Sequence, residues 1–318
     1  MPTSPRLTAI QKERLRRLEP ALRDAVRRAD YKSAKQHAAD IQTVLRPSGH
    51  ETRLMQSKNW LFEAAMQAGR LQIAKAGFIG VRAKTSPRTR VHIEATGLLA
   101  ICYLRQKRLA QAGPLIAEVL TSHNIKSETR KKRFLRLVVR RFEEEGLLAA
   151  LKGQSSESLD PNEIQQEAGL LVQTRTEDEI LASMGDALPY EAVEFLLRID
   201  AAAKRRLTAK ELRYLPTTSD IQRRSELGRT LFGSLKHVMW RSLCDSKSEI
   251  YQAWFGQGLS VVLDKKYFAT AVTAMLLDLG IGTKALAVSA TALLIKLGLE
   301  VYCDRFRPDA VMSARDDA

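Results

Sequence analysis

The sequence predicts an all-α protein made of two helical parts. Aromatic residues make up only 6% of the 318 residues, while Ala, Leu and Arg are abundant, a composition that suits helices better than sheets. Apolar side chains recur at helical spacing along most of the chain, and no segment alternates as a strand would. Charge separates the parts: residues 1–150 hold 30 Lys and Arg against 13 Asp and Glu, whereas residues 151–318 hold 21 against 23.

The expected organisation follows the polar break at Gly153-Gln-Ser-Ser-Glu-Ser158. Residues 1–152 are predicted to form a basic helical-repeat domain, 153–159 a linker and 160–308 a C-terminal helical bundle domain. The segment 309–318 is expected to be a flexible tail. A net charge of +17 over residues 1–150 is typical of a surface that attracts a polyanion, either nucleic acid, anionic lipid or an acidic protein.

A repeat accounts for the basic half. Short turns near residues 29, 69 and 107 are each followed, five residues on, by a small residue: Ala34, Ala74 and Ala112. A fourth turn is expected at Glu145-Gly146-Leu147, which makes the turn spacings 40, 38 and 39 residues. A fixed period of this length with a helix–turn–helix unit is typical of an α-solenoid.

These units resemble tetratricopeptide repeats over about residues 15–150. Leu99 and Tyr103 occupy the packing positions of that family's first helix, Ala112 the small residue at the helix crossing, and Phe78 the aromatic of the second helix. The period departs from the family's 34 residues. The resemblance implies a concave face that binds a peptide or protein, and it implies no catalysis.

The densest charge lies on one predicted helix that begins near Lys126. Its basic residues are the candidate site for a polyanion or partner: Arg130, Lys131, Lys132, Arg133, Arg136, Arg140 and Arg141. Helical spacing places Arg133, Arg136 and Arg140 on one stripe. Such a stripe is either a phosphate-binding surface or the solvated face of an amphipathic helix. No aromatic residues interleave, so nucleic-acid binding would be directed to the backbone rather than to bases.

The C-terminal half carries clear helix starts. Asp160-Pro161 gives an N-cap with a first-turn proline, and Thr176-Glu-Asp-Glu179 reads as a capping box. Further capping boxes are predicted at Thr208-Ala-Lys-Glu211 and Ser246-Lys-Ser-Glu249. A long helix is expected from Asp220 to about Cys244.

Residues 268–303 are the most apolar stretch and predict two helices broken at Gly280-Ile-Gly282. The longest uncharged run of the second, Ala285–Ile295, has 11 residues, whereas a membrane span needs about 20. Buried core helices are therefore expected, with no integral membrane span. The alternative is a pair that inserts into a membrane or an oligomer interface after a conformational change.

No motif predicts catalysis, a cofactor or a metal. The sequence contains no HExxH, phosphate-binding loop or G-x-S-x-G pattern. Cys102, Cys244 and Cys303 are far apart and odd in number, which argues against a disulfide framework and favours a reducing cytoplasm.

Three functions remain open. The first is a non-enzymatic scaffold or adaptor whose repeats bind a protein or peptide partner, with the C-terminal domain as effector or oligomerisation unit. The second is a nucleic-acid-binding protein that uses the basic half. The third is a bacterial sensor–effector whose apolar C-terminal helices act on a membrane or partner.

Overall fold

The computed structural model describes residues 6–153, 158–204, 220–244, 251–252, 267–305 and 310–315. Every regular element in these ranges is a helix, which confirms the all-α prediction. The chain divides into two compact units, and the division falls between Phe142 and Glu143. Unit 1 comprises Met1–Phe142 with Asp309–Ala318, and unit 2 comprises Glu143–Pro308. Of the expected linker 153–159, residues 154–157 lie outside the described part.

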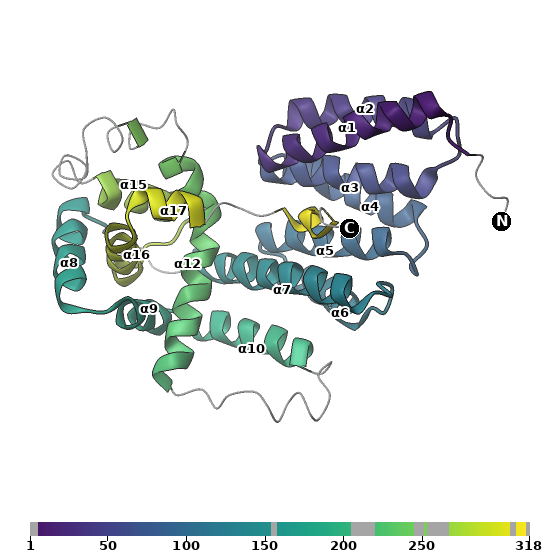
Figure 1. Ribbon diagram of the computed structural model, residues 1–318. Coiled ribbons are helices and arrows are strands. Elements are labelled where there is room, and N and C mark those ends of the chain that lie inside the picture. The colour runs from purple at the N-terminus through teal and green to yellow at the C-terminus, as the bar shows by residue number, and fades with distance from the viewer. Residues whose placement is uncertain are drawn as a thin grey trace. The chain divides into compact units, whose positions relative to one another are not determined.

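Unit 1 contains helices that follow one another in pairs (Figure 1). They are α1 (Ala9–Arg27), α2 (Tyr31–Leu45), α3 (Glu51–Gln67), α4 (Leu71–Lys84), α5 (Arg90–Arg105), α6 (Leu109–Thr121) and the first part of α7 (Glu128–Leu151). Each helix from α1 to α5 contacts the next. The first helices of successive pairs are also in contact, α1 with α3 and α3 with α5. The core of the unit therefore forms between neighbours in the sequence.

The three predicted turns share one backbone conformation. Ala29, Gly69 and Lys107 have positive φ angles of 52°, 76° and 58°. In each turn, the N–H of the following residue donates to the carbonyl five residues earlier, at 2.8, 2.8 and 2.9 Å. This is the Schellman ending, which satisfies orphan carbonyls at the end of a helix. Two of these positions carry a Cβ in a conformation that favours glycine, so the turn geometry is set by its hydrogen bonds.

The alanines that follow these turns are buried. Ala34 and Ala74 expose 0% of their surface, and Ala112 exposes 1%. A small side chain lets two helices approach to the short end of the usual spacing of about 8–10 Å. The predicted role of these alanines at helix crossings agrees with this burial.

The fourth predicted turn, at residues 145–147, is wrong. These residues lie inside α7, which continues to Leu151. Gly146 is explained by packing within unit 2, because a Cβ there would lie 1.8 Å from a ring carbon of Phe195. The glycine makes room for a ring, whereas the sequence pattern predicts a glycine that ends a helix.

Unit 2 is a second helical core. Its helices are the rest of α7, α8 (Pro161–Thr174), α9 (Glu177–Asp186), α10 (Tyr190–Lys204), α12 (Asp220–Cys244), α15 (Tyr267–Asp278), α16 (Lys284–Leu297) and α17 (Leu299–Arg305). The predicted N-cap Asp160 and the capping box at Thr176 are present. The capping boxes predicted at Thr208 and Ser246 lie outside the described residues.

Helix α16 lies at the centre of this core. It contacts α8, α9, α15 and α17, and its residues Leu286–Leu294 are all buried. The predicted break at 280–282 separates it from α15. Of the large apolar side chains in α15 to α17 whose burial is described, Leu277 and Val301 are exposed. No helix in the described ranges combines the length and apolar character needed to cross a membrane.

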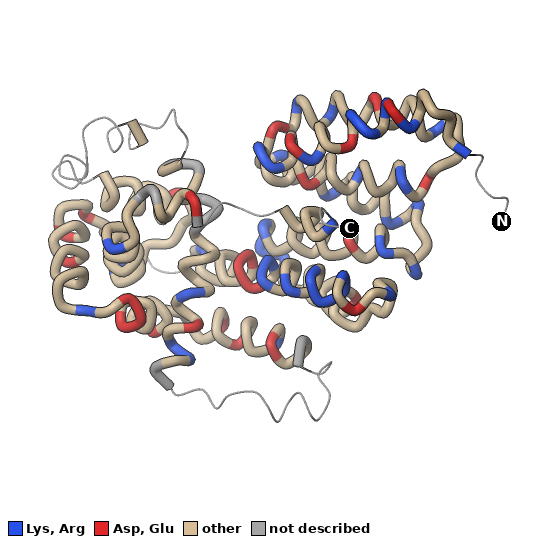
Figure 2. The backbone as a smooth tube through the Cα atoms, in the orientation of Figure 1, with Lys and Arg blue, Asp and Glu red and all other residues tan. Residues whose placement is uncertain are grey.

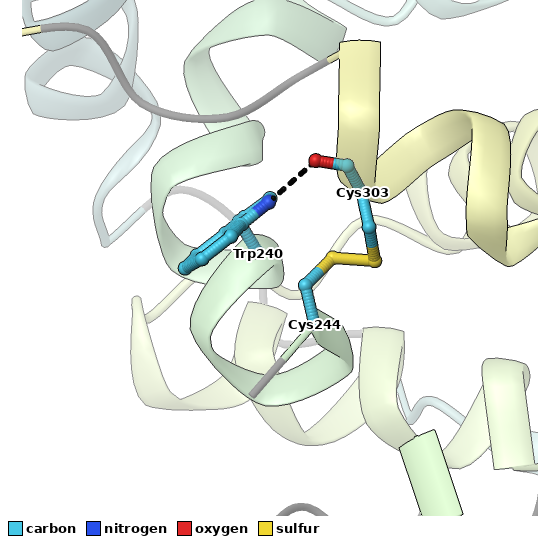
Figure 3. Close-up of a disulfide and its surroundings, with 3 residues drawn as sticks. All are labelled: Trp240, Cys244 and Cys303. Carbon is cyan, nitrogen blue, oxygen red and sulfur yellow. Dashed lines mark hydrogen bonds between the residues drawn. A yellow bond between two sulfur atoms is a disulfide. The ribbon is translucent and has the colours of Figure 1, made fainter. Parts of the chain in front are cut away.

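The cysteine prediction requires correction, because Cys244 and Cys303 form a disulfide (Figure 3). The packing of α12 on α17 brings their Cα atoms to 5.5 Å, although 59 residues separate them in the sequence. The indole N–H of Trp240 donates to the Cys303 carbonyl at 3.0 Å and fixes the same contact. Cys102 is a buried thiol outside this disulfide, and its Sγ lies 3.7 Å from the sulfur of Met66. Disulfides are typical of oxidising environments, so the inference from cysteine usage to a reducing cytoplasm no longer stands.

Candidate functional site

The most distinctive site in unit 1 is a pair of buried carboxylates that hold a segment from the far end of the chain. Residues 311–315 form a short 3₁₀-helix, η1 (Val311–Arg315), which contacts α3 and α5. Figure 1 shows this yellow segment beside α5. The carboxylates are Glu63 on α3 and Glu94 on α5, and we call them the acid cradle. The expectation of a flexible tail at 309–318 does not hold for residues 310–315.

Glu63 caps the first turn of η1. Its carboxylate accepts hydrogen bonds from the backbone N–H groups of Val311 and Met312, the second at 2.9 Å. The first N–H groups of a helix have no partner within it, so an acceptor from another segment stabilises the turn. Val311 and Met312 each expose only 1% of their surface. The same carboxylate therefore sets both the position and the direction of η1.

Burial perturbs Glu63. Loss of solvent raises its pKa to about 7, and this effect exceeds the opposing effects of the two N–H donors and of Arg141 and Arg105. Glu63 is 1% exposed and lies on a helix whose neighbouring positions are mostly apolar. A carboxylate at such a position is stabilised only by partners that reach it.

Glu94 anchors the end of the segment. The guanidinium of Arg315 donates to both of its oxygens, with three N···O distances between 2.7 and 3.0 Å. Arg90, one turn earlier on α5, donates to the same carboxylate at 2.8 Å and to the Ala314 carbonyl at 3.4 Å. The Glu94 side chain is only 2% exposed, and those of Arg90 and Arg315 are each 16% exposed. This two-pronged geometry matches an arginine and not a lysine.

The predicted basic site is not one uniform surface. Lys132, Arg136 and Arg130 are exposed, whereas Lys131, Arg133 and Arg140 are partly buried. Lys131 pairs with Glu128 at 3.3 Å. Arg141 is 4% exposed, and its charge acts on Glu63. Figure 2 shows Lys and Arg spread along many helices of unit 1 rather than gathered on α7 alone.

The acid cradle was absent from the sequence predictions. Glu63 and Glu94 are single acids inside largely apolar helical runs, and that pattern is the signal that could have identified them. Arg315, the partner of Glu94, gave no local signal, because it lies 221 residues away in the sequence.

A second candidate in unit 1 is an open cavity of about 420 Å³ near the start of α3. It is lined by Glu19, Gly49, His50, Glu51, Thr52, Arg53 and Gln56. Arg53 crosses to Glu19 with two hydrogen bonds of 2.7 and 2.9 Å. The charges of Arg53 and Glu19 in this cavity therefore satisfy each other, which leaves little chemistry for a ligand.

In the described part of unit 2, Glu143 is an acid whose pKa is raised by its surroundings. Burial, followed by the nearby charges of Asp200 and Glu144, raises its pKa to about 7. Within the described residues, no group of three or more His, Cys, Asp and Glu could hold a metal ion. Cys244 is oxidised in a disulfide, so it is not a nucleophile in this state.

Comparison of the chain with family models, curated proteins and solved structures gives no match.

Proposed function

We propose that this chain is a non-enzymatic helical-repeat scaffold whose unit 1 binds a protein segment on α3 and α5. The observation that carries the proposal is the acid cradle, which holds a short chain segment by two backbone N–H groups and one arginine. Proteins recognise peptides in this way: hydrogen bonds to the backbone give affinity, and contacts to particular side chains give selectivity.

The repeat geometry supports the same proposal. Three helix pairs joined by the same turn, with a buried alanine in each pair, are consistent with an α-solenoid of the tetratricopeptide kind. The segment contacts α3 and α5, the first helices of the second and third pairs. In the proposed solenoid, first helices would form one continuous binding face.

Nucleic-acid binding has weaker support. Arg141 is buried and acts on Glu63, so it offers nothing to a phosphate. Lys131 is engaged with Glu128. The exposed remainder, Arg130, Lys132 and Arg136, is a small set for a site that binds through phosphate contacts.

Action on a membrane by α15 to α17 also has weaker support. The simplest form of that hypothesis needs an exposed apolar patch from Ala271 to Val301, and most of the described apolar side chains there are buried. The exposed Leu277 and Val301 are two side chains among many.

The test is affinity capture from the native cell with full-length chains, with and without nuclease. We expect an Arg315→Ala chain, in which the internal segment loses its bonds to Glu94, to capture a protein that resists nuclease treatment. Adding Glu94→Gln should abolish the capture, whereas Glu13→Gln, a change at an exposed acid of α1, should leave it intact. Capture that depends on nucleic acid, or that ignores Glu94→Gln, would overturn the proposal.

A further inference from the structure

The segment in the acid cradle behaves as a ligand rather than as part of the repeat. Its hydrogen bonds to Glu63 and Glu94 join residues 221 to 249 positions apart in the sequence. All the polar groups that it offers could be supplied by another polypeptide. They are two N–H groups at the start of a helical turn, one guanidinium and one carbonyl.

Burial defines which side chains such a ligand needs. Val311, Met312 and Ala314 are buried at 1%, 1% and 4% exposure, so these positions require two apolar residues and a small one. The Ser313 hydroxyl donates to the Ala310 carbonyl within the segment itself and, among the described residues, bonds to neither α3 nor α5, so we expect this partly buried position to tolerate other residues. Arg315 supplies the charge. The readable pattern is apolar, apolar, any, small, arginine.

The cradle also requires an occupant. With the segment removed, Glu63 loses both N–H donors while remaining on a mostly apolar helix face. Glu94 would keep Arg90 but lose three of its four short contacts. Leaving buried acceptors without donors is unfavourable, so any segment that restores these donors is favoured.

We propose that the acid cradle recognises an arginine-bearing segment of this pattern in a partner protein, and that residues 310–315 are the chain's own competitor for it. This inference rests on the proposed function and specifies its ligand. A tethered segment acts at a high local concentration, so it lowers the apparent affinity of the partner by the fraction of cradles that it fills. Weakening the internal segment should therefore strengthen binding of an external one.

The experiment uses the full chain and a fluorescein-labelled peptide, Asp-Ala-Val-Met-Ser-Ala-Arg-Asp, with fluorescence anisotropy as the readout. We expect Arg315→Ala to bind this peptide at least tenfold more tightly than the wild-type chain, which corresponds to about 1.4 kcal/mol. A control peptide with Ala in place of Arg should bind at least tenfold more weakly. Glu94→Gln in the Arg315→Ala background should remove the difference between the two peptides.

A second measurement avoids substitutions. Excess peptide added to the wild-type chain should speed hydrogen exchange at the Val311 and Met312 amides, because displacement frees them from Glu63. Unchanged exchange at saturating peptide, or equal affinity for the two peptides, would overturn the inference. If nuclease-resistant capture still depends on Glu94, the proposed function stands and only the arginine pattern is rejected. If neither capture nor peptide binding depends on Glu94, both fail.

Discussion

Glu63 is expected to titrate near neutral pH and to make unit 1 less stable as the pH rises. Its ordinary pKa of 4.5 is raised to about 7 in the folded chain, mainly by burial. The folded chain therefore binds this proton more tightly than the unfolded chain does. Stability is greatest below about pH 4.5, falls between pH 4.5 and 7, and is constant above that range as far as this group is concerned.

The size of the effect follows from the shift. Linkage gives about 1.4 kcal/mol for each pH unit over this window, or about 2.5 kcal/mol between pH 5 and pH 8. Glu63→Gln does not titrate. The gap between the two chains, that is, the unfolding free energy of the wild-type chain minus that of the variant, should therefore fall by that amount as the pH rises. Any contribution from Glu143, in unit 2, is present in both chains and cancels.

Two assays test this prediction. Carbon-13 NMR of the glutamate carboxyl groups should reveal a resonance with a midpoint near pH 7 that disappears in Glu63→Gln. Urea unfolding of both chains at pH 5 and pH 8 should give the changing gap. A Glu63 midpoint near 4.5, or a gap that is the same at both pH values, would refute the reasoning that burial dominates at this site.

Three further predictions concern stability. Gly228→Ala should cost about 1–3 kcal/mol, because its Cβ would lie 1.8 Å from the Leu181 carbonyl and force α9 and α12 apart; an unchanged urea midpoint would contradict this. The matched change Gly80→Ala on α4 meets no atom within 4 Å and should stabilise unit 1 by about 0.5–1 kcal/mol, measured in the same way. Replacing Cys244 and Cys303 with Ser should lower the unfolding free energy of unit 2 by about 2–4 kcal/mol, and dithiothreitol should reproduce this loss in the wild-type chain but not in the double variant.

Local signals in the sequence identified local structure well. The turns at Ala29, Gly69 and Lys107 were predicted from a local pattern, a short turn followed five residues on by a small alanine, and each has the same Schellman ending. The N-cap at Asp160 and the capping box at Thr176 were predicted because each depends on residues within one helical turn. Interactions that span three or four residues leave a readable pattern.

Features made by distant residues were missed. The disulfide joins residues 59 positions apart, and the spacing of three cysteines gave no hint of it. The acid cradle joins α3 and α5 to Arg315, and the basic stripe on α7 drew the site prediction away from it. Gly146 was misread because its reason, the ring of Phe195, also lies far away in the sequence. In each case the decisive partner comes from another part of the chain.

Unit 1 is built from two segments that are far apart in the sequence, and this has a consequence for protein synthesis. A ribosome makes Met1–Phe142 first, then all of unit 2, and only afterwards the residues that fill the acid cradle. Glu63 and Glu94 therefore lack the hydrogen bonds of residues 310–315 throughout the time in which unit 2 is made. Under the proposed function, a partner that meets the nascent chain during this interval competes with no internal segment, so the order of translation would favour early binding and late self-closure.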